Sequence, residues 1–203
     1  MVVQIEFPEL EAPARIFFDG KRFDHEAYWN FCVANPSVRS ELNAHGEIII
    51  VPPAGGESSY QSLDVASQLF NWARADGRGK SFDSSGGFIL PSGAVSAPDA
   101  AWVSNARLET LTKRQRQKFI PLAPEFVIEV MSPKDTLPVA QVKMEAWIAG
   151  GVELGWLIDP KRRAVLVYRI GAGSLRLNAP KKLAGEGPME GFLLELQGVW
   201  AGL

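Results

Sequence analysis

The stretch "EFVIEVMSP", residues 125–133, reads as a central strand of a sheet, yet it carries a carboxylate in its middle. Apart from Glu129, residues 126–131 are all apolar, which is typical of a strand that is buried on both faces. A buried carboxylate without a partner is strongly unfavourable or stays protonated. The sequence therefore predicts a core strand whose glutamate either lies in a salt bridge, or points to an exposed face, or binds a metal ion.

Further strands are predicted on both sides of this one. They lie around Ser81-Phe82 and in four apolar stretches: "GFIL" (87–90), "DAAWVS" (99–104), "ELGWLID" (153–159) and "AVLVYRI" (164–170). In addition, Ala44-His45-Gly46 separates two extended runs, which predicts an earlier hairpin. The tail from Ser174 alternates weak strands with loops.

Helical spacing predicts three main helices. The first covers residues 24–34 with Asp24 as its N-cap, the second runs from about 57 to 75, and the third from about 139 to 149, closed by Gly150-Gly151. The mixed order of strands and helices predicts an α/β or α+β fold, with a central mixed β-sheet flanked by α-helices. Because no stretch is rich enough in Gly, Ser or Pro to act as a linker, residues 1–203 are expected to form one domain.

Composition excludes several classes of protein. The 203 residues are 46% hydrophobic and 22% charged, as in an ordinary globular protein, and the formal net charge is −2. Such a charge argues against a tight nucleic-acid coat protein, although it allows an enzyme in brief contact with a polyanion. The single cysteine, Cys32, the absence of a signal-peptide pattern in residues 1–10 and the lack of a long apolar run predict a soluble cytoplasmic protein with no membrane association.

Asp99 and Glu129 are the leading candidates for chemistry. Asp99 follows Pro98 at the start of one predicted core strand, and Glu129 lies inside another. If the two strands are neighbours, both carboxylates can converge on one Mg²⁺ ion, which proteins typically bind through one or two carboxylates, water and substrate phosphate. The alternative is a solvated Asp99 and a salt-bridged Glu129.

Three further groups are candidates, although a helix lysine and a charge run are usually solvated surface and Glu41 could equally be an exposed strand glutamate. Lys143 lies on the helix after the Glu129 strand, one turn before Trp147, and could stabilise charge on a phosphate. Glu41, on the first hairpin, could be a third acidic group. The basic segment "KRQRQK", residues 113–118, could contact a phosphate backbone or could simply be a solvated face.

Taken in order, Pro98-Asp99, Glu129 in an apolar strand and Lys143 on a helix resemble the PD-(D/E)XK nuclease superfamily. More closely, the sequence resembles the Uma-type putative restriction endonucleases, a family long catalogued as a domain of unknown function. The resemblance covers about residues 22–170 and rests on four blocks: "NPSVRSELNAHGEIIIVPPAGG", "SSGGFILPSGAVSAPDAAWVS", "APEFVIEVMSP" and "KMEAWIAGGVELGWLIDP". It implies a restriction-endonuclease-like core over about residues 22–170, and the pattern of weak strands after it predicts a β-rich extension over residues 171–203.

The resemblance also implies roles for individual residues. Asp99 and Glu129 would be metal ligands, together with the Val130 backbone carbonyl, and Glu41 would be an auxiliary acidic group. The lysine of the superfamily motif falls at Met131 here, so Lys143 on the following helix would take its place.

The function that follows is a Mg²⁺- or Mn²⁺-dependent endonuclease that cleaves DNA phosphodiester bonds, expected to act as a homodimer. One alternative is a catalytically silent member of the fold that serves as a binding or assembly module. Another is a carboxylate-based hydrolase acting on something other than nucleic acid. For a glycosidase, however, aromatic platforms would be expected near both acids, and Trp102 and Trp147 alone do not make that case.

Overall fold

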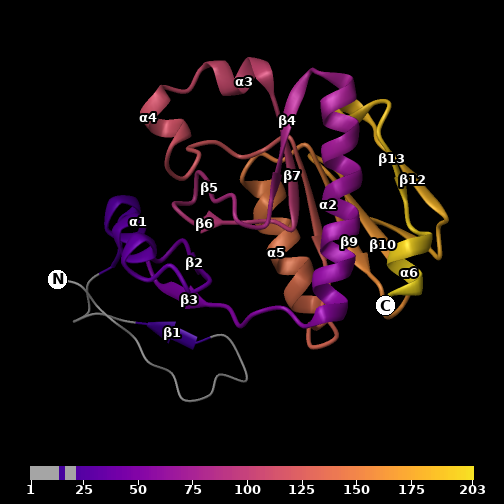
Figure 1. Cartoon of the computed structure of the whole chain (residues 1–203), viewed down its shortest axis with the longest axis horizontal. Coiled ribbons are helices and arrows are strands. Elements are labelled where there is room, and N and C mark those ends of the chain that lie inside the picture. The colour runs from indigo at the N-terminus through magenta and orange to yellow at the C-terminus, as the bar shows by residue number, and fades with distance from the viewer. Residues whose placement is uncertain (1–13, 17–21) are drawn as a thin grey trace.

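The computed structural model describes residues 14–16 and 22–203 (Figure 1). Residues 1–10, in which no signal peptide is expected, lie outside this part of the chain. No helix among the described residues combines the length and the apolar character that a membrane crossing requires.

A six-stranded mixed sheet forms the centre of the fold, in the order β11-β10-β9-β8-β7-β4. Strands β8 and β9 are parallel and the other neighbours are antiparallel. The strands are β4 (Gly79–Asp83), β7 (Ala100–Ser104), β8 (Phe126–Val130), β9 (Leu154–Asp159), β10 (Ala164–Arg169) and β11 (Leu175–Asn178). This arrangement confirms the predicted central mixed sheet, and β8 is buried along its whole length.

Two long helices cover opposite faces of this sheet (Figure 1). Helix α2 (Gly56–Asp76) packs on the face formed by Phe126 and Ile128, and α5 (Leu137–Ala149) packs on the face formed by Val127. Gly155 allows the close approach of α5, because a Cβ atom there would lie only 2.5 Å from the Met144 side chain. The β8–α5–β9 segment is thus a crossover connection between two parallel strands.

A second, five-stranded sheet lies beside the first, in the order β1-β3-β2-β6-β5. It consists of β1 (Ala14–Ile16), β2 (Ser40–Leu42), β3 (Ile48–Ile50), β5 (Phe88–Ile89) and β6 (Val95–Ser96). Helix α1 (His25–Ala34) packs on this small sheet through Tyr28 and Phe31. The predicted hairpin at Gly46 is the β2–β3 turn, where a φ of +73° suits glycine.

The remaining elements are short. Helices α3 (Asn105–Glu109) and α4 (Lys113–Arg116) lie between β7 and β8. After β11 come the strand pair β12 (Lys182–Ala184) and β13 (Leu193–Glu195), the 3₁₀ helix η1 (Gly187–Met189) and α6 (Gln197–Ala201). These last elements add buried side chains to the α2 face of the central sheet.

Candidate active site at the junction of the two sheets

Strand β8 directs Glu129 into the layer between the central sheet and α5. Side chains alternate along a strand, and the neighbours of Glu129 on its own face, Val127 and Met131, belong to the apolar cluster that includes Trp147 of α5. Glu129 is only 9% exposed. Its carboxylate therefore depends on polar groups of the protein for compensation.

Two side chains one turn apart on helix α5 donate hydrogen bonds to the Glu129 carboxylate. The Lys143 amine lies 2.9 Å from Oε1 and 3.0 Å from Oε2 of Glu129, and the buried Trp147 Nε1–H donates to Oε1 at 2.8 Å. Residues four apart share one helix face, so the spacing of Lys143 and Trp147 allows both to reach the same carboxylate. Sequence reasoning noted this shared face but did not assign Trp147 the hydrogen bond.

Asp99 reaches the same region from the position directly before β7. The pairing of β7 with β8 stops at Ala100 and Ile128, so Val130 extends beyond the last pair. Its backbone N–H donates instead to Asp99 Oδ2 at 2.7 Å, and Ser62 of α2 donates to Oδ1 at 3.2 Å. The aspartate thus replaces the missing strand partner, and Ser62 is a contact that the sequence did not indicate.

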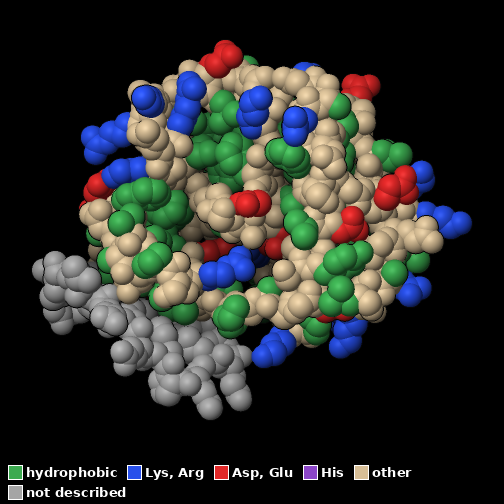
Figure 2. Space-filling model, in the orientation of Figure 1, with side chains coloured by type: hydrophobic (Ala, Val, Ile, Leu, Met, Phe, Trp, Pro, Cys, Tyr) green, Lys and Arg blue, Asp and Glu red, His purple; other side chains and the backbone are tan. Residues whose placement is uncertain are grey.

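Glu41 completes the cluster from the other sheet. Its Oε1 lies 3.3 Å from the Lys143 amine, and it accepts a hydrogen bond from the Ala97 N–H at 3.4 Å. The structure therefore brings together Asp99, Glu129, Lys143 and Glu41, which come from two sheets and a helix. Figure 2 shows acidic and basic side chains gathered in a hollow between the small sheet and α2.

The electrostatics of the cluster follow from burial. Desolvation raises the pKa of Glu129 to about 7, in opposition to Lys143, while the nearby Asp99 and Glu41 add to the rise. Burial likewise raises the pKa of Asp99, against the Val130 N–H and the Lys143 charge. Burial disfavours the charge on Lys143, but Glu129, Glu41 and Asp99 outweigh it, so the pKa of the amine lies above its ordinary value and the amine stays protonated.

The donor atoms suit a hard divalent cation. Asp99, Glu129 and the Val130 carbonyl offer oxygen ligands, the kind that Mg²⁺ and Mn²⁺ prefer. Within the described residues, no group of three His, Cys, Asp or Glu side chains is placed to hold one metal ion, so a site here would be of the two-carboxylate type. An ion at Glu129 would also compete with the Lys143 amine, which already contacts both carboxylate oxygens.

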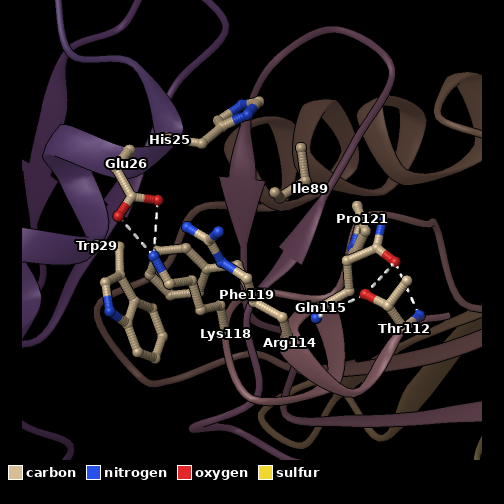
Figure 3. A pocket seen from close by; sticks show the side chains of 10 residues that line it. All are labelled: His25, Glu26, Trp29, Ile89, Thr112, Arg114, Gln115, Lys118, Phe119 and Pro121. Atoms are coloured by element: carbon tan, nitrogen blue, oxygen red, sulfur yellow. Dashed lines mark hydrogen bonds and ion pairs between the residues drawn. The ribbon is translucent and has the colours of Figure 1, made fainter.

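The basic segment 113–118 lies between Asp99 and Glu129 in the sequence and borders a pocket of about 210 Å³ between α1 and α4 (Figure 3). Lys118 is engaged there, because its amine lies 2.6 Å from Glu26 Oε1 and 5.7 Å from the centroid of a Trp29 ring. Arg114 lines the same pocket and is exposed. Part of the segment is therefore committed to internal contacts and part is available to a ligand.

Comparisons with known proteins identify the family and the fold. The family described as "Uma2: Putative restriction endonuclease" matches residues 25–197. The chain is also similar to a solved structure, a putative nuclease belonging to DUF820 from Anabaena variabilis ATCC 29413, with 21% sequence identity and a TM-score of 0.65. That similarity covers 80% of this chain and 89% of the other, and it concerns the fold. No curated protein matches the sequence.

Proposed function

This chain belongs to the Uma2 family of putative restriction endonucleases, and from this premise we propose that it is a metal-dependent endonuclease that hydrolyses DNA phosphodiester bonds. Family membership supports a nuclease function. The observation that carries the finer proposal is the Lys143 amine, which forms ion pairs with Glu129 and Glu41 and also lies within the electrostatic influence of Asp99. Three carboxylates and a lysine where the two sheets meet form a suitable set of groups for metal-assisted phosphodiester hydrolysis.

In this proposal each residue has a distinct task. Asp99, Glu129 and the Val130 carbonyl hold Mg²⁺ or Mn²⁺, which when bound would polarise the scissile phosphate and lower the pKa of a bound water. Lys143 carries a fixed positive charge, so it stabilises negative charge on the phosphate and orients the attacking water but does not accept a proton. Glu41 and Trp147 position Lys143 and Glu129 through the contacts described above.

Plasmid nicking tests the proposal directly. Purified protein should convert supercoiled DNA to the open-circular form with Mg²⁺ or Mn²⁺ and should be inactive with a chelator. Asp99→Asn, Glu129→Gln and Lys143→Met should each lower the rate by about 100-fold or more, because each removes a charge at the reacting phosphate or its metal.

Two exposed residues provide matched controls for these variants. Glu145→Gln removes a carboxylate from the same helix as Lys143, and Lys134→Met removes a nearby lysine. Both should retain the wild-type rate. Nicking that survives Asp99→Asn and Glu129→Gln, or that ignores the chelator, would exclude this site as the source of activity.

A catalytically silent binding or assembly module is the second candidate, and one observation favours it. Lys143 and Trp147 already occupy both oxygens of Glu129, so the carboxylate is compensated without a metal ion. Titration calorimetry with Mn²⁺ separates the two candidates. Heat of binding that is lost in Asp99→Asn favours the nuclease, whereas no binding in the wild-type protein favours the silent module.

We also propose that the active form is a homodimer. The chain has a formal net charge of −2, so a single copy offers little general attraction for DNA, and two copies would double the number of phosphate contacts. Light scattering after gel filtration should then give about twice the 22.2 kDa of one chain. A mass of one chain at the protein concentration used for nicking would contradict the dimer.

A further inference from the structure

Arg39 is a cation beside the candidate active site to which the proposed mechanism gives no task. It directly precedes β2, the strand that carries Glu41. Its backbone is fixed, because the Val51 N–H donates to the Arg39 carbonyl at 2.9 Å and the buried Tyr28 hydroxyl donates to the Ser40 carbonyl at 2.7 Å. The side chain itself is exposed. Arg39 thus combines an exposed side chain with a hydrogen-bonded backbone.

The strand geometry directs this side chain toward the cluster of carboxylates. In the β2–β3 hairpin, Leu42 packs into the buried cluster under α1, and alternation turns Glu41 to the opposite face. Arg39, two residues before Glu41, falls on that same face. There Glu41 contacts Lys143, and the Arg39 charge is close enough to counteract the rise that burial causes in the pKa of Asp99.

The guanidinium is also available to a ligand. Within residues 22–203, no hydrogen bond or ion pair to another side chain holds it, although Arg78, Arg162 and Arg169 each bind a carboxylate. A polyanion that approaches Asp99, Glu129 and Glu41 is repelled by them, and a cation at the rim offsets this repulsion. The planar fork of arginine matches a phosphate, to which it can donate two parallel hydrogen bonds.

We propose that Arg39 binds a backbone phosphate of the DNA next to the scissile one, and so places the strand against the carboxylates and Lys143. This inference rests on the proposed nuclease function and adds a phosphate subsite to it. It makes Arg39 a substrate-binding residue on the small sheet, while the groups that act on the reacting phosphate lie mainly on the central sheet and α5. Substrate binding would therefore require both sheets.

The test is DNA binding without catalysis. The affinity for a fluorescent 20-base-pair duplex is measured by anisotropy in EDTA, at 50 and 200 mM salt, for the wild type, Arg39→Ala and Arg39→Lys. The matched control is Arg176→Ala, on the outer strand β11. Losing one phosphate contact lowers the salt slope by about 0.9, so the affinity loss in Arg39→Ala should be about 3.5-fold larger at 50 mM than at 200 mM salt. Arg39→Lys should keep most of the slope, and Arg176→Ala should match the wild type.

The outcomes separate this inference from the function on which it rests. If the wild type binds and nicks DNA while Arg39→Ala keeps its affinity and slope, only the Arg39 subsite is refuted. If Arg39→Ala loses the salt-dependent affinity but the wild type never cleaves, the subsite stands and the nuclease proposal fails. A wild-type protein that neither binds the duplex in EDTA nor nicks the plasmid with Mg²⁺ or Mn²⁺ refutes both, whereas one that nicks but does not bind in EDTA refutes only the Arg39 subsite. Thermal melting should be unchanged in Arg39→Ala, because the anchoring bonds belong to the backbone and to Tyr28.

Discussion

The buried Glu129 carboxylate has two hydrogen-bond donors, Lys143 and Trp147, and they differ in how far they are buried. Lys143 is 37% exposed at its side chain, whereas Trp147 is 1% exposed and packed in the core. The indole N–H is therefore the steadier support of the carboxylate. This makes Trp147 a positioning residue, and its loss should affect stability even when no substrate is present.

Trp147→Phe should lower the free energy of unfolding by about 1–3 kcal/mol, because it keeps most of the ring but leaves a buried carboxylate oxygen with one donor fewer. Urea denaturation followed by circular dichroism gives the value. Trp29→Phe, at a half-buried tryptophan on α1, is the control and should cost less. Equal costs for the two variants would show that the hydrogen bond to Glu129 is not important for stability.

The buried hydroxyl of Tyr28 should make the folded protein less stable at alkaline pH. Burial raises the pKa of its hydroxyl above the ordinary value of about 10, so the folded protein keeps the proton after the unfolded chain has released it. The stability from this group is complete below about pH 10 and declines as the pH rises further. Tyr28→Phe removes the titration, so its free energy of unfolding should fall less between pH 9 and pH 11 than that of the wild type. Parallel pH profiles would disprove the assignment.

At the scale of elements, local sequence patterns were reliable where one segment determines the structure. The helix after Asp24 begins as expected, with the Asp24 carboxylate accepting from the Ala27 N–H at 2.7 Å. The strand around Glu129 and the helix that carries Lys143 also lie where the apolar pattern placed them. The order of Asp99, Glu129 and Lys143 along the chain led correctly to residues that are close in space.

Patterns failed where pairing between distant segments decides the outcome. Strand β6 is two residues long and was not predicted. It is a strand because it pairs with β2 and β5, and its own sequence carries no strand pattern. For the same reason, the sequence did not reveal that "GFIL" belongs to a separate sheet with the first hairpin. Ser62 was missed because its hydrogen bond to Asp99 joins residues 37 positions apart.

Under the proposed nuclease function, helix α4 is the element expected to extend DNA contact beyond the candidate active site. Lys113 and Arg114 are exposed on it, while Lys118, just after it, is bound to Glu26. The double variant Lys113→Ala/Arg114→Ala should reduce the salt slope of duplex binding by up to about 0.9 for each phosphate released. The Lys118→Ala variant should change the slope less. The reverse order would indicate that Lys118 leaves Glu26 to bind DNA.

At the scale of the whole molecule, the C-terminal segment is part of the core. Phe192 is 2% exposed, and its ring centroid lies 5.7 Å from that of Trp156, 6.1 Å from that of Phe126 and 5.2 Å from that of Trp72. The β-rich extension predicted over residues 171–203 therefore shares an apolar cluster with β8 and α2. The expectation of one domain implies that this segment and the central sheet unfold together.

Phe192→Ala should accordingly destabilise the entire chain by about 3–5 kcal/mol, as expected for truncation of a buried aromatic side chain. The adjacent Leu193→Ala, at a residue that is 48% exposed, should cost about 0.5 kcal/mol or less. Urea unfolding monitored by both tryptophan fluorescence and circular dichroism measures the costs. Two separated transitions would show that the extension unfolds independently of the central sheet.

The position of Lys143 among three carboxylates also determines whether the chain needs a metal ion in order to fold. The ammonium group is covalently attached, so the charge that allows the acidic residues to fold together is present as soon as the chain is synthesised. Unlike a zinc finger, whose fold requires its ion, this chain should fold fully in metal-depleted medium. Exhaustive dialysis against EDTA should leave its melting temperature unchanged. A large fall in the melting temperature would mean that a tightly bound metal ion, in addition to Lys143, stabilises the carboxylates.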